Sequence, residues 1–416
     1  MNAKLSRYSI IILITISLSI LLPNLYWMIF DKPLRTPQIS YSPIIKDFVY
    51  SQTNDNNRDE KTYRDNQGNS YDRKSYEALL PFSFYYNLDK WGILPDSIDG
   101  IPVNISYIRR NSQFVRIRSV YFHTPMIQLN PLFESQSDFT RLEMPNELFR
   151  ISDKLEFLNA RSNSVVDSLS ELYNQAMTEQ EFQFPAKYIA GNPTTRKAFD
   201  EGYFIIDATN TVFHLKQIKG KPYCVRTNIP TDLNIRYITV QENSRREFYA
   251  IMVTLENDLY LISYDDYKLI RLPINDFIAD EMDLMFYIDP IYRTFKYYSD
   301  KELKCIVTDH DYNVIDTYQT SWTPKTEWVS SKIAASIFPF QAERENARTD
   351  YILFNLKFSG WLALIGIFLA LGITIFVKVR IHGENLKENW FDLLIVAVTG
   401  LYGALAVLLI RPEPWD

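Results

Sequence analysis

Cysteine and glycine are scarce in this sequence, which has 2 cysteines and 12 glycines in 416 residues. Cys224 and Cys305 can form at most one disulfide, and the C-x-x-C spacing typical of a redox or zinc site does not occur. Because spacing along the chain does not give the distance between two thiols, a disulfide and two free thiols both stay open, with free thiols favoured.

The sequence also lacks the short motifs of three large enzyme classes. Without G-x-S-x-G, G-x-x-x-x-G-K-[ST] or G-x-G-x-x-G, it does not predict an α/β-hydrolase, a nucleotide-hydrolysing enzyme or a Rossmann oxidoreductase. No histidine has a second one at ligand spacing, and a polar turn at 309–311 lacks the ligand pattern of a calcium loop. We therefore predict no catalytic, cofactor-binding or metal-binding residue. The four histidines are His123, His214, His310 and His382. His214 alternates with apolar neighbours along the chain, a pattern that favours a structural histidine.

A strong charge of one sign is absent as well. The chain has 44 basic and 50 acidic residues without a block of like charges, so nucleic-acid binding has no electrostatic basis. Because the chain has 50 acidic residues, some carboxylates will lie close together by chance. Five of them, however, are predicted to lie in loops beside aromatic residues, as they would in a glycan-binding site or a carboxylate-dependent hydrolase. These are Asp96, Asp99, Asp200, Glu201 and Glu242.

Three apolar segments, at 8–30, 358–377 and 391–410, are each long enough to cross a bilayer. No small-x-small cleavage site follows the first, so we predict an uncleaved anchor and not a signal peptide. Basic residues in 1–7 and in the short loop 378–390 place both in the cytoplasm. The prediction is a multi-pass protein of the bacterial inner membrane, with residues 31–357 and the tail 411–416 on the extracytoplasmic side.

Small residues recur at four-residue spacing in the two C-terminal segments, as Gly366 with Ala370 and Gly400 with Ala404. Such pairs let helices approach closely. Packing of these two segments on each other is the favoured interpretation, and docking of one face on a separate membrane protein is the alternative. No charge lies at mid-depth, since Asp392 stands at the very start of the third segment, which argues against a self-contained transporter.

Between the membrane segments, short β-rich runs are separated by Asn, Asp and Gly turns. The last three predicted hairpins recur at about 45–55 residues, a period typical of radial or stacked β units. We predict a mainly β, propeller-like or meandering domain, with an irregular sandwich as the alternative. The hairpins are Lys61–Tyr76, Val103–Val120, Tyr203–Lys216, Phe248–Ser263 and Cys305–Tyr318.

One helix is predicted inside this β pattern, over 164–178, with Asn163 or Ser164 as its cap. Its apolar face would comprise Val165, Val166, Leu169, Leu172, Tyr173 and Ala176. The helix either packs on the side of the β domain or marks a division near residue 190.

The most distinctive segment runs from Phe182 to Lys216. Its Gly-Asn-Pro-Thr at 191–194 predicts a turn, since Asn before Pro is pushed out of the helical region. Arg196, Lys197, Asp200 and Glu201 follow, and they fit either a structural loop with local ion pairs or a surface docking loop.

LPDSIDGIPV at 94–103, GNPTTRKAFDEGYFIIDATNTVFHLK at 191–216 and ENSRREFYAIMV at 242–253 resemble an uncharacterised family of bacterial membrane-anchored proteins. Like that family, a domain of unknown function, the chain has an N-terminal span, a large domain and C-terminal spans. The resemblance implies an association with ABC-type transporter genes and supplies no catalytic residues.

Together these features predict a non-enzymatic envelope protein. It would serve as an accessory or partner-binding subunit of a membrane complex, which the resemblance implies is an ABC-type transporter. The partners would be the lipid bilayer and another membrane protein, contacted through the small-residue faces of the second and third spans. The alternative is an extracytoplasmic ligand- or glycan-binding module or, with less support, a carboxylate-dependent hydrolase.

Overall fold

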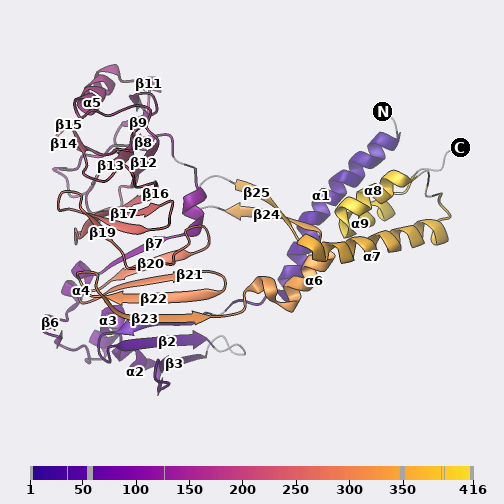
Figure 1. Ribbon diagram of the computed structural model, residues 1–416, viewed down its shortest axis with the longest axis horizontal. Coiled ribbons are helices and arrows are strands. Elements are labelled where there is room, and N and C mark those ends of the chain that lie inside the picture. Colours follow the sequence, from indigo (N-terminus) through magenta and orange to yellow (C-terminus); the bar gives the residue numbers. More distant parts are fainter. Residues whose placement is uncertain are drawn as a thin grey trace. The chain divides into compact units, whose positions relative to one another are not determined.

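The computed structural model describes residues 3–34, 36–53, 60–125, 127–346, 352–385, 387 and 389–412. The chain divides into two compact units, each described by itself (Figure 1). Residues 36–321 form the β unit, and residues 1–35 with 322–416 form the helical unit. Both sides of residue 190 belong to the β unit, so the division suggested there does not separate compact units.

The β unit is a series of antiparallel meanders, each with its strands hydrogen-bonded in sequence order. The first sheet holds β1 (Gln38–Ser42), β2 (Asp47–Thr53), β3 (Lys61–Asp65) and β4 (Ser70–Tyr71), and the second holds β8 (Asn130–Pro131), β9 (Glu147–Ile151), β10 (Leu155–Asn159) and β11 (Ser164–Val165). The third holds β12 (Tyr188–Gly191), β13 (Tyr203–Ile206), β14 (Val212–Ile218) and β15 (Lys221–Arg226), and the fourth β16 (Ile235–Val240), β17 (Phe248–Thr254), β18 (Leu259–Ser263) and β19 (Leu269–Arg271). The fifth holds β20 (Asp283–Ile288), β21 (Arg293–Tyr298), β22 (Glu302–Thr308) and β23 (Val314–Ser321), with β7 (Gln113–Ile117) added beside β20.

Hydrophobic clusters join the sheets face to face. One cluster joins the second sheet to the third, another the third to the fourth, and another the fourth to the fifth. The first sheet packs on the fifth, where Phe48 lies 5.5 Å from Tyr318 and Tyr41 lies 5.1 Å from Tyr292, between ring centroids. The first and second sheets lie at opposite ends of this stack (Figure 1). The predicted β meander is confirmed in this form, and the described residues show no closed propeller.

Strand β13 shows why the third sheet lies inside the stack. Its sequence, Tyr-Phe-Ile-Ile, is buried at every position. Tyr203 and Ile205 face the cluster shared with the second sheet, whereas Phe204 and Ile206 face the fourth. A strand that is apolar without alternation is buried on both faces, as the sequence of β13 indicates.

The residues at the turns determine where the predicted hairpins fold back. The β13–β14 turn is closed by Asp207, whose carboxylate accepts the N–H groups of Thr209 and Thr211 at 2.8 and 2.9 Å. In the β22–β23 turn, Asp309 accepts the N–H groups of residues 311 and 313 in the same way. Asp side chains favour such turns because they replace backbone hydrogen bonds. These two hairpins and β17–β18 are confirmed. The hairpin predicted at Lys61–Tyr76 is confirmed as β3–β4 only as far as Tyr71, because a helix begins at Arg73.

The hairpin predicted at Val103–Val120 is wrong. Residues Ile105–Asn111 form helix α4, and only β7 follows as a strand. Asn104 caps the helix by accepting the Tyr107 N–H at 2.9 Å, and this cap decides the local structure. The remaining short elements are α2 (Arg73–Ala78), α3 (Pro81–Lys90), β5 (Ser97–Ile98), β6 (Ile101–Pro102) and a 3-10 turn at Ser119–His123.

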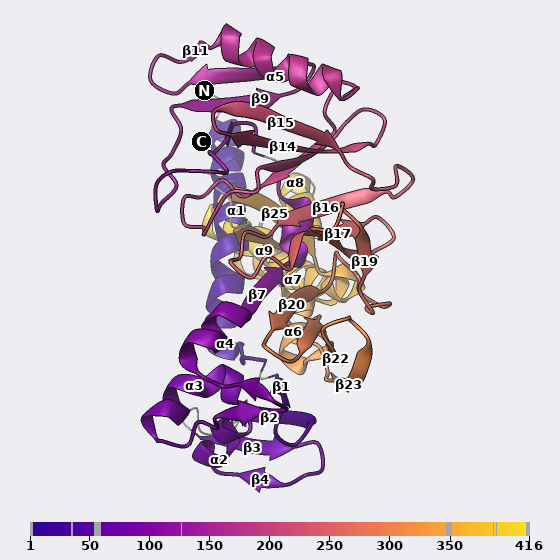
Figure 2. The same ribbon diagram turned by 90° about the vertical axis from the view of Figure 1, so that its left-hand side faces the viewer.

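The inserted helix is α5 (Asp167–Glu179), which packs on the second and third sheets (Figure 2). Neither Asn163 nor Ser164 caps it, because Ser164 and Val165 pair with β10 as strand β11. Its buried residues are Ser170, Tyr173 and Met177, whereas Leu172 is 43% exposed. The helix is therefore rotated from the predicted face, and the Ser170 hydroxyl accepts the Phe157 N–H of β10 at 2.9 Å.

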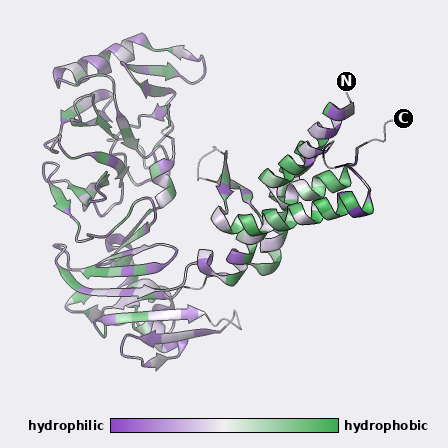
Figure 3. Cartoon of the chain, turned by 45° about the vertical axis from the view of Figure 1, so that its right-hand side comes forward, coloured by the Kyte–Doolittle hydropathy of each residue, from purple (hydrophilic) through white to green (hydrophobic). Residues whose placement is uncertain are grey.

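Two segments of the helical unit, Lys4–Phe30 and Gly360–Ile381, are long and apolar enough to cross a membrane (Figure 3). Only 22% of the most apolar window of each is buried, so their apolar side chains are largely exposed. A core helix of a soluble protein would be mostly buried. The unit comprises α1 (Ala3–Phe30), a 3-10 turn at Lys325–Glu327, α6 (Val329–Ile337), β24 (Phe340–Asn346), β25 (Ile352–Phe358), a 3-10 turn at Gly360–Leu362, α7 (Ala363–Phe376), a π turn at Val377–Ile381, α8 (Trp390–Thr399) and α9 (Leu401–Leu409).

The predicted third span is not one helix. Gly400, with φ 57° and ψ −128°, divides it into α8 and α9, of 10 and 9 residues. At about 1.5 Å per residue, neither reaches across a core of about 30 Å. Arg7 of α1 contacts both Asp392 near the start of α8 and the carbonyl oxygen of Ile410 after α9. The two helices therefore form a hairpin that returns to its own end, so residue 411 lies at the end of the unit where Arg7 lies. The described residues thus hold two candidate membrane-spanning helices instead of the three predicted.

A buried ion cluster fastens this end of the hairpin. The Arg7 guanidinium binds both oxygens of Asp392 at 2.9 and 2.7 Å, and Lys378 binds the same carboxylate at 2.8 Å. The side chains of Asp392 and Lys378 are 0% and 1% exposed. Lys378 also contacts Glu384. In the sequence, Asp392 stands at the very start of the third apolar segment. In the structure, three segments of the chain enclose its side chain.

The small residues of the C-terminal segments contact the unit itself. A Cβ on Gly366 would lie 2.1 Å from the Ser336 carbonyl oxygen of α6, and one on Gly400 would lie 3.2 Å from Pro339. Ala370 and Ala404 belong to one buried cluster with Ile11. Close approach at these positions holds the helical unit together.

We expect Asp392→Asn to destabilise the helical unit by about 3–5 kcal/mol, because Arg7 would lose its counter-charge and the buried Lys378 would keep only Glu384. Thermal unfolding of the full chain in one detergent, followed by circular dichroism, measures the loss. The matched control is Asp31→Asn, whose pair with Lys325 is 49% and 42% exposed. It should change stability by no more than about 0.5 kcal/mol. Equal effects of both variants would contradict a clasp at Asp392.

Candidate binding site in the β unit

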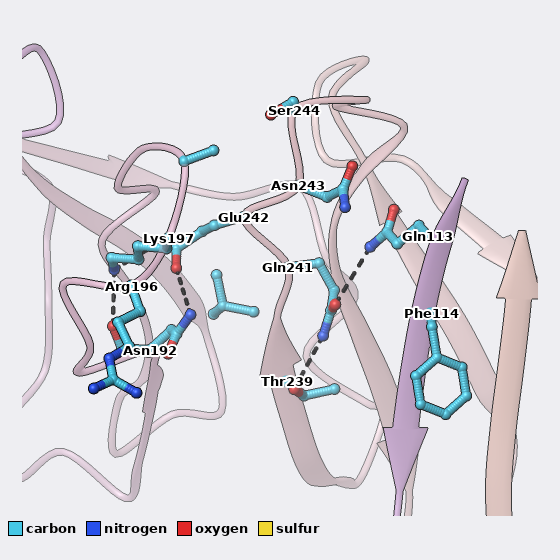
Figure 4. A pocket seen from close by; sticks show the side chains of 13 residues that line it. Gln113, Phe114, Asn192, Arg196, Lys197, Thr239, Gln241, Glu242, Asn243 and Ser244 are labelled. Carbon is cyan, nitrogen blue, oxygen red and sulfur yellow. Dashed lines mark hydrogen bonds and ion pairs between the residues drawn. The ribbon is translucent and has the colours of Figure 1, made fainter. Parts of the chain in front are cut away.

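A cavity of about 530 Å³ opens between the third, fourth and fifth sheets (Figure 4). Its size lies within the usual range for small-molecule sites. Its lining is unusually polar for such a site, consisting mostly of amide, hydroxyl and charged side chains. The lining residues are Gln113, Phe114, Gly191, Asn192, Arg196, Lys197, Ala198, Thr239, Val240, Gln241, Glu242, Asn243 and Ser244.

Three strand ends supply this lining: the end of β12, the end of β16 and the start of β7. At the end of β12 the chain needs a glycine, because a Cβ on Gly191 would lie 2.2 Å from the ring of Tyr203. The predicted turn follows there, with the Thr194 N–H donating to the Asn192 carbonyl at 2.9 Å. The loop 192–202 then crosses the base of the cavity.

Lys197 anchors this loop from inside. Its ammonium donates to Asp200 at 2.5 Å, to Glu242 at 2.8 Å and to the Asn192 carbonyl at 2.8 Å. The side chains of Lys197, Asp200 and Glu242 are 3%, 0% and 1% exposed. An ammonium has three donors, and each has a partner here. The cluster therefore joins the loop after β12 to the segment after β16.

The carboxylate of Glu242 is engaged at both oxygens. Oε1 accepts the Glu201 N–H as well as Lys197, and Oε2 accepts the Asn192 amide, each at 2.8 Å. Burial raises the pKa of Glu242 above its ordinary value, and the nearby Lys197 opposes that rise. Two carboxylates share one lysine, so the buried cluster carries an excess of negative charge.

A second set of contacts holds the other end of the loop. The Glu201 side chain pairs with Lys216 and accepts the Tyr264 hydroxyl at 3.0 Å. Its carbonyl oxygen lies 2.5 Å from His214 Nε2, and His214 Nδ1 lies 3.0 Å from the Tyr267 hydroxyl. His214 is fully buried, and burial lowers its pKa to about 3, so the ring is neutral. The predicted structural role of His214 is confirmed.

The structure joins two of the five carboxylates that the sequence singled out, because Asp200 and Glu242 share Lys197. The Glu201 carboxylate pairs with Lys216 instead, and only its backbone N–H reaches Glu242. Asp96 and Asp99 lie around β5 and β6, where Asp99 pairs with Lys46 on the surface. The ion pairs of the 191–202 loop are buried, unlike the exposed pairs expected for a structural loop. Arg196 stays outside the cluster, at the rim of the cavity.

Sequence reasoning missed the amide side of the cavity. Gln113 of β7 contacts Gln241 after β16 at 3.4 Å, although the two are 128 residues apart. Neither belongs to a motif, and β7 was predicted as part of a hairpin, so no local signal linked them.

The other candidate groups lie apart from the cavity. Cys224 of the third sheet and Cys305 of the fifth are free thiols, and burial raises the pKa of each to about 12. His123 pairs with Asp280, and His310 with Asp311. Among the described residues, no group of three or more His, Cys, Asp and Glu side chains is arranged to hold a metal ion.

We expect a larger loss of stability when the cation of the buried cluster is removed than when one of its two carboxylates is neutralised. Lys197→Met leaves two buried carboxylates without their cation and should cost about 3–5 kcal/mol of stability at neutral pH. Glu242→Gln removes the excess charge and keeps a neutral Lys197–Asp200 pair, so it should cost less than about 1.5 kcal/mol. Thermal or urea unfolding of the full chain in detergent compares them.

The pH dependence follows from the raised pKa of Glu242. The folded chain holds this proton more tightly than the unfolded chain, so its stabilising contribution is complete at acidic pH and is lost as pH rises through the raised pKa. Relative to wild type, Glu242→Gln should therefore gain stability as pH rises from about 4 to 7. A difference that does not change over this range would contradict the assignment.

Comparisons with solved structures find distant likenesses. PorZ, a surface component of the type-IX secretion system of Porphyromonas gingivalis, is 9% identical with a TM-score of 0.22, and the match covers 77% of this chain and 37% of that one. The dihydro-heme d1 dehydrogenase NirN is 10% identical, with a TM-score of 0.22 and 68% and 69% covered. A prolyl endopeptidase is 10% identical, with a TM-score of 0.20 and 77% and 49% covered. This chain thus spans little more than a third of PorZ.

No curated protein matches the chain. A family model does match, over residues 38–308. This range extends from β1 to β22 and includes every residue of the cavity. Its family is described as a domain of unknown function, so membership assigns no activity. The resemblance drawn from the sequence is confirmed: the chain belongs to the family of the domain of unknown function DUF4857.

Proposed function

We propose that this chain is a non-catalytic, membrane-anchored binding subunit of the bacterial envelope, whose β unit recognises a ligand outside the cytoplasm. One observation carries the proposal. The cavity is walled by amides and hydroxyls, and the ionisable groups at its base are already bound to one another. Groups arranged in this way orient a ligand by hydrogen bonds.

Catalysis would need a free group at the same place. A general base must direct an unoccupied lone pair at the substrate, and a nucleophile must be exposed to it. Glu242 is bound at both oxygens, and Lys197 has a partner for each of its donors. Releasing either group would break a buried pair at a cost of about 3–5 kcal/mol. This cost favours recognition over reaction.

The helical unit supports a membrane anchor. Two helices of suitable length keep apolar side chains exposed, which lipid tails can cover. Basic residues lie at the Arg7 end, where the chain also carries Lys378 and Arg380, and such residues favour the cytoplasmic side. The β unit is inserted in the chain between α1 and α6, so both of its ends lead to the anchor. We therefore place the β unit on the extracytoplasmic face of the inner membrane.

We further propose that the chain has a partner in the membrane, a component of an ABC-type transporter. The small-residue positions are occupied within the unit, so we propose that a partner contacts the exposed apolar faces of α1 and α7 in place of lipid. Any energy-consuming step would then belong to the partner chain.

Cysteine labelling tests the anchor and its topology. In spheroplasts, a membrane-impermeant maleimide should modify Asp265→Cys, at a site 72% exposed on the β unit. It should modify Arg411→Cys only after permeabilisation, because the α8–α9 hairpin returns to the Arg7 end. The wild-type chain, with its two free thiols Cys224 and Cys305, serves as the background control.

Labelling of Arg411→Cys from outside, together with Asp265→Cys, would contradict the hairpin and restore a third span. Labelling of neither variant in spheroplasts would contradict the extracytoplasmic placement of the β unit.

A further inference from the structure

We infer that the cavity between β7, β12 and β16 binds an acidic saccharide, with Arg196 taking its carboxylate and the surrounding amides taking its hydroxyl groups. This inference rests on the proposed binding function and adds to it the class of the ligand.

Arg196 is the group that selects for an anion. It lies exposed at the rim of the cavity, and among the described residues only its backbone N–H has a partner, the Thr194 hydroxyl at 3.1 Å. A guanidinium presents paired donors that match the two oxygens of a carboxylate. The neighbouring cation, Lys197, is fully engaged below it, so Arg196 is the cation that the cavity offers to a ligand.

The opposite wall is suited to hydroxyl groups. Gln113 donates to Gln241 at 3.4 Å, and Gln241 donates to Thr239 at 3.3 Å (Figure 4). Both distances exceed the usual range of about 2.7–3.2 Å for N–H donors, so these bonds are weak and the groups keep capacity for a ligand. An amide offers both donors and acceptors, as a sugar hydroxyl does.

Two further residues extend this polar wall. Asn243 uses its side-chain oxygen to accept the Arg245 N–H at 2.9 Å, which leaves its NH₂ group for the cavity. Ser244 adds a hydroxyl beside it. Hydrogen bonds of this kind reject a ligand that lacks the matching groups, since buried polar atoms would lose their partners.

An exposed aromatic pair adjoins the polar wall. Phe114 lines the cavity and is 53% exposed, and its ring centroid lies 4.7 Å from that of Tyr287. The negative face of an aromatic ring attracts the weakly positive C–H groups of a sugar ring. An acidic peptide would meet the same arginine, but its further carboxylates would find no second free cation among the described lining residues, whereas sugar hydroxyl groups match the amides of the opposite wall. The observations therefore favour a saccharide.

Isothermal titration calorimetry of the full chain in detergent tests the inference. The probes are trigalacturonic acid and the neutral galactose trisaccharide of the same length. We expect the acidic probe to bind at least about tenfold more tightly, with an affinity that falls as salt concentration rises. Arg196→Gln should weaken binding of the acidic probe about ten- to hundredfold and leave the neutral probe unchanged.

Matched variants separate the contribution of the Arg196 charge from that of the amides. Arg226→Gln makes the same change of charge at a site 53% exposed outside the cavity, and it should leave both affinities unchanged. Gln241→Ala should weaken both probes, because it removes a hydroxyl-binding amide. Thermal unfolding of each variant shows that the chain remains folded.

Equal affinity for the two probes, or no effect of Arg196→Gln, would overturn the role of Arg196. Absence of binding to both probes, or binding of tetraglutamate in their place, would overturn the saccharide class and leave the membrane-anchored binding function standing. Cleavage of trigalacturonic acid during the titration, seen by chromatography, would support the ligand class and overturn the non-catalytic function.

Discussion

Lys197 lies buried between two carboxylates, and the arrangement of the cavity depends on that contact. This contact joins the loop after β12 to the segment after β16, so two sheets that pack by apolar contacts are also joined by a buried ion cluster. Isolated buried charges are costly, whereas a fully hydrogen-bonded set is rigid. The loop 192–202 can therefore hold Asn192 and Arg196 at fixed positions without a helix or strand of its own.

The helical unit uses the same principle at a different place. Asp392 is buried between Arg7 and Lys378, and it fixes the start of a hairpin that otherwise holds itself by close apolar packing. In each unit, a buried acid–base contact joins segments that are distant in the chain. Apolar burial supplies most of the stability of such units, and the ion clusters specify which segments meet.

Local chemistry explains what the sequence predicts correctly. The hairpins at Asp207 and Asp309 follow from their turn residues, and the burial of β13 follows from its apolar run. Prediction failed where a competing local contact or tertiary packing decided the outcome, as with the Asn104 cap of α4 and the rotated face of α5. Composition identified a third apolar segment but not its division at Gly400. At the cavity, the carboxylates were recognisable by type, whereas the contact between Gln113 and Gln241 depends on how the sheets stack.

Hydrogen–deuterium exchange of the full chain tests the central claim, that a buried ion cluster makes the cavity loop rigid. The Glu201 N–H donates to the Glu242 carboxylate and the Gly202 N–H donates to Asp200. Both amides should exchange as slowly as those inside β13 and β14, because opening them requires disruption of the cluster. Exchange as fast as in the exposed turn at Asp265 would contradict the account, since the loop would then open without breaking the fold.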